Sequence, residues 1–124
     1  MAATGAGGAP ATQRAVVAVI GLGYAGVCAV PLLAKAGFHV VGIDRRAAFF
    51  HRVALPLALV DTGFADRLYY PYERLLKRHQ GEFVQGTVSR IGDKAVHLDD
   101  GRTIAFDYAL VTTGSRFNST VDST

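Results

Sequence analysis

The stretch Ala15-Val-Val-Ala-Val-Ile-Gly-Leu-Gly-Tyr-Ala-Gly26 decides the fold. Its first six residues are apolar without polar alternation, which is typical of a strand buried on both faces of a parallel sheet. The residues from Tyr24 to Ala36 then carry apolar side chains at helical spacing. Gly37 suits the position after a helix, because glycine tolerates a positive φ. The stretch therefore predicts a strand, a tight glycine turn and a helix.

Gly21, Gly23 and Gly26 form a G-x-G-x-x-G motif between this strand and helix, where a dinucleotide-binding fingerprint lies. The first glycine permits a tight turn, the second lets the backbone approach a pyrophosphate, and the third lets the helix pack closely on the sheet. The N-terminus of the helix presents N–H groups to the phosphates. We therefore expect this loop, including Tyr24 and Ala25, to bind a dinucleotide.

A second buried strand is predicted over 38–43, and Asp44 closes it 23 residues after Gly21. A carboxylate at this position accepts ribose hydroxyls of an adenosine and repels a 2′-phosphate, which favours NAD or FAD over NADP. Arg45 and Arg46 soften this preference because either could meet a phosphate, although two arginines at a strand end are more often solvent-exposed. The alternative is a glycine-rich turn with Asp44 as a solvated strand end.

After the second strand, the regular alternation of strand and helix gives way to short helices and short strands. A loop with a short helix is expected over 45–72, followed by a short charged helix over 73–80. The sequence Asp99-Asp-Gly101 indicates a hairpin turn between two short strands. The strands expected in this part are 83–86, a three-stranded antiparallel meander of 88–91, 95–98 and 103–106, and a buried strand over 108–112.

Composition narrows the class of protein. The 124 residues are 50% hydrophobic and 19% charged, which excludes a disordered or coiled-coil chain. The one cysteine, Cys28, excludes a disulfide framework and multi-cysteine metal sites, and we expect it to be a packed, inert thiol. No metal site is expected. A net charge of +3 from scattered basic residues gives no case for nucleic acid binding.

Twenty residues without charge lie between Arg14 and Lys35, a length that would permit a transmembrane helix. Three glycines and Pro31 inside this segment favour the strand, turn and helix instead, so we expect no transmembrane segment. Residues 1–14 and 117–124 are expected to be flexible or disordered tails. We expect a cytoplasmic chain, with any membrane association coming from regions that it does not contain.

The first third of the chain is similar to NAD-dependent nucleotide-sugar dehydrogenases, in which the βαβ pattern would continue. Here a meander follows instead, and an apolar strand runs into Thr112-Thr-Gly114. That order resembles the FAD domain of apoptosis-inducing-factor-like, ferroptosis-suppressor-type oxidoreductases, from residue 16 to about residue 116. The segments that carry the resemblance are Phe50-His51, Val60–Ala65, Tyr70-Pro-Tyr72, Phe83–Gly86, Asp100-Gly101, Phe106–Val111 and Thr113-Gly-Ser115.

The resemblance implies an α/β fold: a Rossmann-type parallel sheet with the meander as an insert, in a partial FAD/NAD(P)-binding domain over 15–116. It implies FAD as cofactor, NAD(P)H as electron donor and a quinone-type acceptor. It also implies that Gly21, Gly23 and Gly26 hold the FAD pyrophosphate. The other positions implied are Asp44 at the adenosine ribose, the backbone of Val84 at the adenine, Thr113 and Gly114 along the cofactor, and His51 on the flavin side.

His51 has a second interpretation that we favour, a partly buried structural histidine. Three positions depart from the family pattern: Leu57 stands where an arginine is frequent, Thr112 replaces an alanine, and Pro31 is unusual in the fingerprint helix. We expect this chain not to be catalytically complete, since no NAD(P)H domain is included, and its strand over 108–112 to offer an apolar edge for oligomerisation. The alternatives are the NAD-binding domain of a nucleotide-sugar dehydrogenase and a non-catalytic dinucleotide-binding module.

Overall fold

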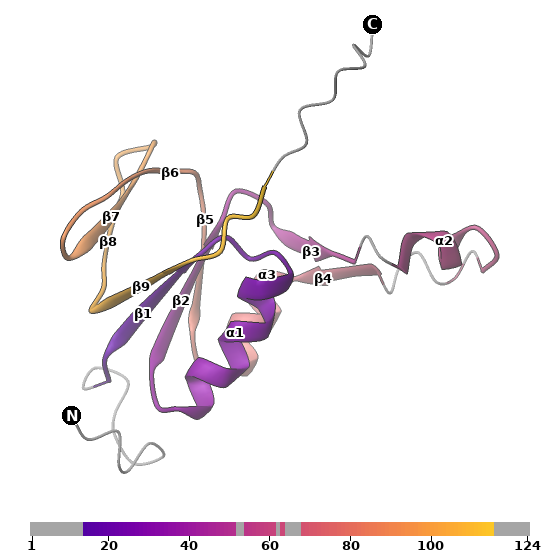
Figure 1. The fold of residues 1–124 in the computed structure, drawn as a ribbon, viewed down its shortest axis with the longest axis horizontal. Coiled ribbons are helices and arrows are strands. Elements are labelled where there is room, and N and C mark those ends of the chain that lie inside the picture. The colour runs from indigo at the N-terminus through magenta and orange to yellow at the C-terminus, as the bar shows by residue number, and fades with distance from the viewer. Residues whose placement is uncertain (1–13, 52–53, 62, 64–67, 116–124) are drawn as a thin grey trace, which may run out of the picture.

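The computed structural model describes residues 14–51, 54–61, 63 and 68–115, and these form an α/β fold with an arm that extends to one side (Figure 1). Apart from Arg14, the expected tails lie outside the described residues, as does part of the 60–65 segment. The elements are, in chain order, β1 Val16–Ile20, α1 Tyr24–Lys35, β2 His39–Asp44, β3 Ala48–Phe50, α2 Leu55–Ala58, β4 Tyr69–Pro71, α3 Tyr72–Arg78, β5 Glu82–Gln85, β6 Val88–Ile91, β7 Ala95–Leu98, β8 Thr103–Ala105 and β9 Tyr108–Val111.

The central sheet has the strand order β5-β2-β1-β9, and all three of its pairings are parallel. This is the order of the first four strands of a doubly wound sheet. The meander is also confirmed, because β6, β7 and β8 form a separate antiparallel sheet. The predicted fold class, a Rossmann-type sheet with a meander insert, is therefore confirmed.

The sheet is buried on both faces, which explains why its central strands are almost continuously apolar. Successive side chains of a strand point to opposite faces, so β1 and β2 contribute to two cores. The helices α1 and α3 cover one face and the meander covers the other (Figure 1). The helix-side core consists of Val17, Val19, Leu22, Val30, Val40, Tyr72, Leu75 and Leu76. The meander-side core consists of Ala18, Ile20, Val41, Ile43, Val96, Leu98 and Phe106.

Helix α1 begins and ends close to where the sequence predicts. Gly23 is its N-cap and Ala36 its C-cap, with Pro31 inside the helix. Gly37 follows with a φ of 96°, the left-handed conformation expected just beyond a helix C-terminus. Within the described ranges, no helix has both the length and the apolar character needed to cross a bilayer.

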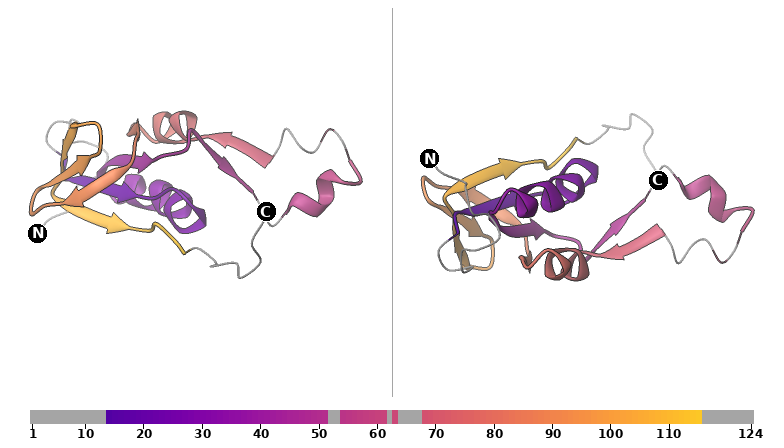
Figure 2. Two further views of the ribbon diagram at one scale, coloured as in Figure 1. Left: turned by 90° about the horizontal axis from the view of Figure 1, so that it is seen from above. Right: turned by 90° about the horizontal axis from the view of Figure 1, so that it is seen from below.

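Three predictions about local structure are wrong. The 45–72 segment holds a two-stranded antiparallel ribbon, β3 with β4, in addition to a short helix; together they form the arm that extends from the body in both views of Figure 2. The β9 strand is exposed along its whole length, because it is the end strand of the described sheet. The expectation of a buried strand over 108–112 is therefore wrong, whereas the expected apolar edge is present. The Cys28 side chain is exposed, so the expectation of a packed thiol is wrong.

Candidate functional site

The glycine loop, Asp44 and the Thr112–Gly114 turn lie at one edge of the central sheet. They follow the carboxyl ends of β1, β2 and β9, and parallel strands place these ends together. In open α/β sheets, ligands bind at this edge, where the strand order reverses. The order reverses between β1 and β9 here, so the predicted residues lie at the expected binding crevice.

Gly21 and Gly26 are required by close backbone packing. Gly21 has a φ of 91°, and a Cβ on it would lie 2.7 Å from the Thr112 carbonyl oxygen and the Thr113 Cα. A Cβ on Gly26 would lie 2.2 Å from the Gly21 carbonyl oxygen. The hydroxyl of Thr112 donates a 2.6 Å hydrogen bond to that same carbonyl oxygen. The first and third glycines therefore let the loop, α1 and the end of β9 meet without a gap.

Gly23 lies in open space. A Cβ built on it would have no heavy atom within 4 Å, and the same holds for Gly114, whose φ is 79°. Gly23 is also the N-cap of α1, makes no side-chain cap and precedes a first turn without acidic residues. The N–H groups of a first turn have no partner within their own helix. The loop thus keeps room for a group that approaches the helix N-terminus, as a pyrophosphate does.

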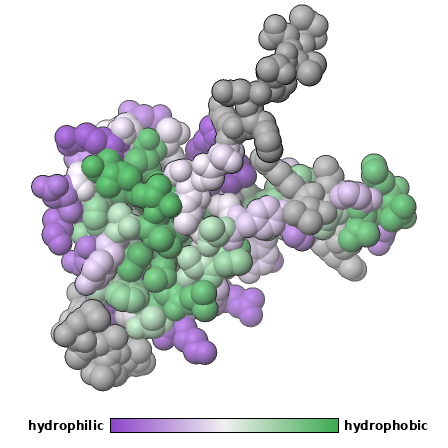
Figure 3. Space-filling model, in the orientation of Figure 1, coloured by the Kyte–Doolittle hydropathy of each residue, from purple (hydrophilic) through white to green (hydrophobic). Residues whose placement is uncertain are grey.

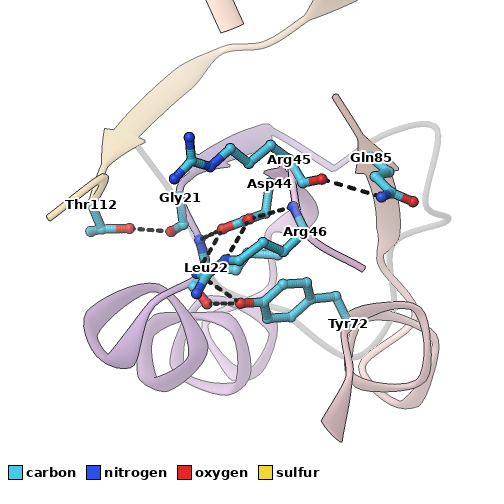
Figure 4. Close-up of polar contacts among 8 residues, drawn as sticks. All are labelled: Gly21, Leu22, Asp44, Arg45, Arg46, Tyr72, Gln85 and Thr112. Carbon is cyan, nitrogen blue, oxygen red and sulfur yellow. Dashed lines mark hydrogen bonds and ion pairs between the residues drawn. The ribbon is translucent and has the colours of Figure 1, made fainter. Parts of the chain in front are cut away.

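Asp44 is held by both the loop and its own turn (Figure 4). Its Oδ2 accepts a 2.8 Å hydrogen bond from the backbone N–H of Leu22. Its Oδ1 accepts a 2.8 Å bond from the backbone N–H of Arg46, the geometry of an Asx turn. The Arg46 guanidinium adds bonds to Oδ1 at 3.2 Å and to Oδ2 at 3.4 Å. Asp44 is 8% exposed, so a largely buried carboxylate takes part in this charge-assisted pair.

The electrostatics keep this carboxylate ionised. Burial by itself would raise the pKa of Asp44, but the hydrogen bonds from the Arg46 side chain, the Arg46 backbone and Leu22 outweigh it and hold the pKa below its ordinary value. The same bond raises the pKa of Arg46. An ionised carboxylate is an acceptor only. Asp44 can therefore receive ribose hydroxyls without a change of protonation.

Tyr72 completes the network from the first turn of α3. Its hydroxyl donates to the backbone carbonyl of Leu22 and accepts a 3.2 Å hydrogen bond from Nη2 of Arg46. The side chain is 0% exposed, and its ring contacts Phe83 at a centroid distance of 5.4 Å. Both backbone polar groups of Leu22, in the middle of the glycine loop, are thus held by side chains, the carboxylate of Asp44 and the phenol of Tyr72.

The structure places the other predicted residues at varying distances from this network. No hydrogen bond or ion pair is drawn between the Arg45 side chain and Asp44 in Figure 4, and the Arg45 carbonyl oxygen accepts a bond from Gln85. Val84 pairs with Ile43 on the neighbouring strand, so it lies two strands away from the loop.

His51 and Tyr24 come together at the base of the arm. Nδ1 of His51 lies 3.1 Å from the Tyr24 hydroxyl, and the imidazole stacks on Phe49. These three residues line a cavity of about 340 Å³ with Val27, Cys28, Leu68 and Tyr70. His51 is exposed, so the expectation of a partly buried histidine is wrong: the ribbon turns it toward the rim of this cavity.

Sequence reasoning missed Tyr72 as a site residue and did not predict the contact between Arg46 and Asp44. Arg46, like Arg45, is expected to be solvent-exposed or to meet a phosphate. The Asx turn at Asp44 instead folds Arg46 back onto the carboxylate, while its side chain stays 40% exposed. The signal for Arg46 is the turn itself, since Asp favours a bond to the backbone two residues on. The signal for Tyr72 is its spacing from Leu75 and Leu76, which places all three on the buried face of α3.

The residues present fit an adenosine diphosphate group. Open space at Gly23, an uncapped helix N-terminus and an ionised carboxylate at the end of β2 match the parts of such a ligand. Among the residues that the structure describes, no three His, Cys, Asp or Glu side chains are grouped to hold a metal ion.

The chain matches only part of the length of each of these relatives. The chain is 38% identical over 99 residues to Apoptosis-inducing factor homolog A of Dictyostelium discoideum, which covers 80% of this chain and 24% of that protein. It is 33% identical over 101 residues to Ferroptosis suppressor protein 1 of Xenopus tropicalis, covering 80% of this chain and 26% of that protein. The chain thus spans about a quarter of the length of these relatives.

Solved structures share the fold. The sulfide:quinone oxidoreductase from Aquifex aeolicus matches with a TM-score of 0.70 at 24% identity, over 82% of this chain and 25% of that chain. Residues 15–122 match the family described as pyridine nucleotide-disulphide oxidoreductase. The chain therefore belongs to the pyridine nucleotide-disulphide oxidoreductase family, with relatives among the apoptosis-inducing-factor homologues and ferroptosis suppressor proteins.

Proposed function

We propose that this chain is the FAD-binding portion of an NAD(P)H-dependent flavoprotein oxidoreductase that passes electrons to a quinone-type acceptor. The observation that carries the proposal is the convergence of the Gly23 loop and the ionised Asp44 carboxylate at the switch point of the sheet. The family assignment and the names of the relatives support the oxidoreductase class.

Each part of the cofactor has a proposed partner. The pyrophosphate lies over Gly23 and the first turn of α1, where the helix dipole favours negative charge. The adenosine ribose lies against Asp44, and the adenine lies beside the backbone of Val84. Thr113 and Gly114 line the cofactor beyond the pyrophosphate, and His51 with Tyr24 lies toward the flavin side. The flavin supplies the two-electron chemistry when it is bound.

Two observations favour this proposal over an NAD-binding domain of a nucleotide-sugar dehydrogenase. The meander packs on the face of the sheet where a further helix of a continuing βαβ pattern would pack. The family match covers the glycine motif, the meander and β9 together. The same proposal includes NAD(P)H as the electron donor, a quinone-type acceptor and a cytoplasmic location.

Titration of the purified 124-residue chain with FAD tests the proposal. We expect the flavin fluorescence to change on binding, ADP to compete with FAD, and the chain alone not to oxidise NADH with a soluble quinone. Competition by ADP identifies the adenosine half as the anchor. An unchanged flavin spectrum at millimolar protein would rule out FAD binding by this chain, and quinone-dependent NADH oxidation would show that it is more than a binding portion.

A further inference from the structure

The Asp44 carboxylate, which the proposed function assigns to a ribose, already has its acceptor positions filled. It accepts four hydrogen bonds, two from backbone N–H groups and two from the Arg46 guanidinium. A carboxylate offers about four acceptor positions. A ribose diol brings two further donors, so two of the present donors have to leave before the diol can bind.

The distances indicate which donors leave. The backbone bonds from Leu22 and Arg46 are both 2.8 Å long and belong to the glycine loop and the Asx turn. The guanidinium bonds are longer, at 3.2 and 3.4 Å. The Arg46 side chain is 40% exposed, whereas that of Asp44 is 7% exposed. The guanidinium can therefore move into solvent without disturbing the backbone. It withdraws two N–H donors, the same number as the hydroxyl donors that a ribose diol brings.

Tyr72 gives the displaced guanidinium a second acceptor. Nη2 of Arg46 donates to the Tyr72 oxygen at 3.2 Å, and this oxygen is held by its own bond to the Leu22 carbonyl. Neither bond uses the acceptor positions of Asp44. Arg46 can thus keep one contact beside the site after it releases the carboxylate.

We propose that Arg46 is a place-holder for the adenosine ribose: its guanidinium satisfies Asp44 in the absence of ligand and is displaced by the ribose diol. This inference rests on the proposed function, because it needs an adenosine at Asp44. Arg46 is a positioning residue in this scheme. It keeps a largely buried carboxylate paired and oriented, because an unpaired buried charge is costly. The same pairing makes Arg46 compete with the ligand for Asp44.

Calorimetric titrations with ADP and 2′,3′-dideoxy-ADP test the place-holder in the full chain. In wild type, loss of the diol weakens binding only a few-fold, because Arg46 returns to Asp44. In Arg46→Met, which removes the donors but keeps the stem, loss of the diol weakens binding tenfold or more (about 1.5–3 kcal/mol for a hydrogen bond to a charged group). Arg46→Met also binds ADP at least as tightly as wild type. Arg78→Met, an exposed residue on α3, is the charge-matched control and behaves as wild type.

A spectroscopic readout covers the case in which Arg46→Met does not fold. The Nε–H resonance of Arg46 in wild type shifts when ADP is added and stays in place with 2′,3′-dideoxy-ADP. Two results would overturn the place-holder while leaving ADP binding intact. One is that Arg46→Met binds ADP more weakly than wild type and loses no more affinity than wild type when the diol is removed. The other is that the Nε–H resonance of wild type does not shift when ADP is added. Absence of ADP binding by wild type removes the proposed function itself, and the place-holder with it.

Discussion

The Tyr72 hydroxyl donates a hydrogen bond to the backbone carbonyl of Leu22, a residue 50 positions earlier in the chain. This bond joins the start of α3 to the middle of the glycine loop, and both residues are 0% exposed. Asp44 accepts from the N–H of the same residue. The peptide groups on either side of Leu22 are therefore fixed in orientation by side chains from β2 and α3, before any ligand is present.

Replacing Tyr72 with Phe should destabilise the chain. The substitution keeps the ring but leaves the buried Leu22 carbonyl without its donor, at a cost of about 1–3 kcal/mol in the free energy of unfolding. Urea denaturation measures the change as a lower midpoint at an unchanged slope. The control is Tyr69→Phe, since Tyr69 is 61% exposed and should shift the free energy by less than about 0.5 kcal/mol. Equal stability of both variants would show that the bond contributes nothing.

Tyr72 also predicts a loss of stability in alkali. Burial, and next the negative charge of Asp44, raise the pKa of Tyr72 from 10.0 to about 12. The unfolded phenol therefore releases its proton first, so the contribution of Tyr72 is fully present below about pH 10 and is lost as the pH rises toward 12. Unfolding free energies measured across this window should fall more steeply for wild type than for Tyr72→Phe. Parallel pH profiles of the two proteins would contradict the raised pKa.

The sequence predicts the central strands and the meander because local patterns determine them. Buried runs specify β1 and β2, and the Asp99-Asp-Gly101 turn predicts the hairpin between β7 and β8, with a φ of 91° at Gly101. Close packing at the glycine motif is predictable for the same reason, since the requirement for small residues lies in the motif itself.

Features that depend on contacts between residues far apart in the chain could not be predicted from the sequence. The β3–β4 ribbon pairs Ala48–Phe50 with Tyr69–Pro71, two segments between which α2 lies, and the apolar residues of this region are equally consistent with a loop. The bond from Tyr72 to Leu22 depends on how α3 docks on the sheet. The apolar sequence of β9 is typical of a buried strand, and its exposure depends on its place at the end of the sheet; the expected apolar edge came from the family resemblance and not from the strand's own sequence.

Substitutions at Gly23 and Gly26 should separate ligand binding from folding. Alanine at Gly26 would place Cβ 2.2 Å from a backbone oxygen, and such overpacking costs about 1–3 kcal/mol or more. Alanine at Gly23 meets no heavy atom within 4 Å and has an allowed φ of −78°, so we expect a loss of only about 1 kcal/mol as an N-cap. Its methyl group occupies the space proposed for the pyrophosphate. Calorimetry should therefore show Gly23→Ala folded but unable to bind ADP; normal binding by it would contradict the phosphate position.

Thr112 should stabilise the loop through its hydroxyl. That hydroxyl donates to the Gly21 carbonyl at 2.6 Å and joins the end of β9 to the turn after β1. Thr112→Val keeps the shape and removes the donor, so the free energy of unfolding should fall by about 1 kcal/mol. Thr112→Ser keeps the hydroxyl and should restore most of the loss. Thermal denaturation of the three proteins provides the comparison, and a Val variant as stable as wild type would show that this bond has no net effect.

The exposed β9 strand should make the chain associate. Tyr108 and Val111 are 53% and 54% exposed and Leu110 is 37% exposed, and apolar residues gather in the middle of this face of the molecule (Figure 3). An edge strand with an apolar face pairs readily with another chain, and a charge on it prevents such pairing. Light scattering after size exclusion should give a mass that rises with concentration for wild type and remains that of a monomer for Val111→Lys. Val60→Lys removes an 84% exposed apolar residue from the arm instead and should associate as wild type does. If both lysine variants suppress association equally, general surface hydrophobicity and not the β9 edge is responsible.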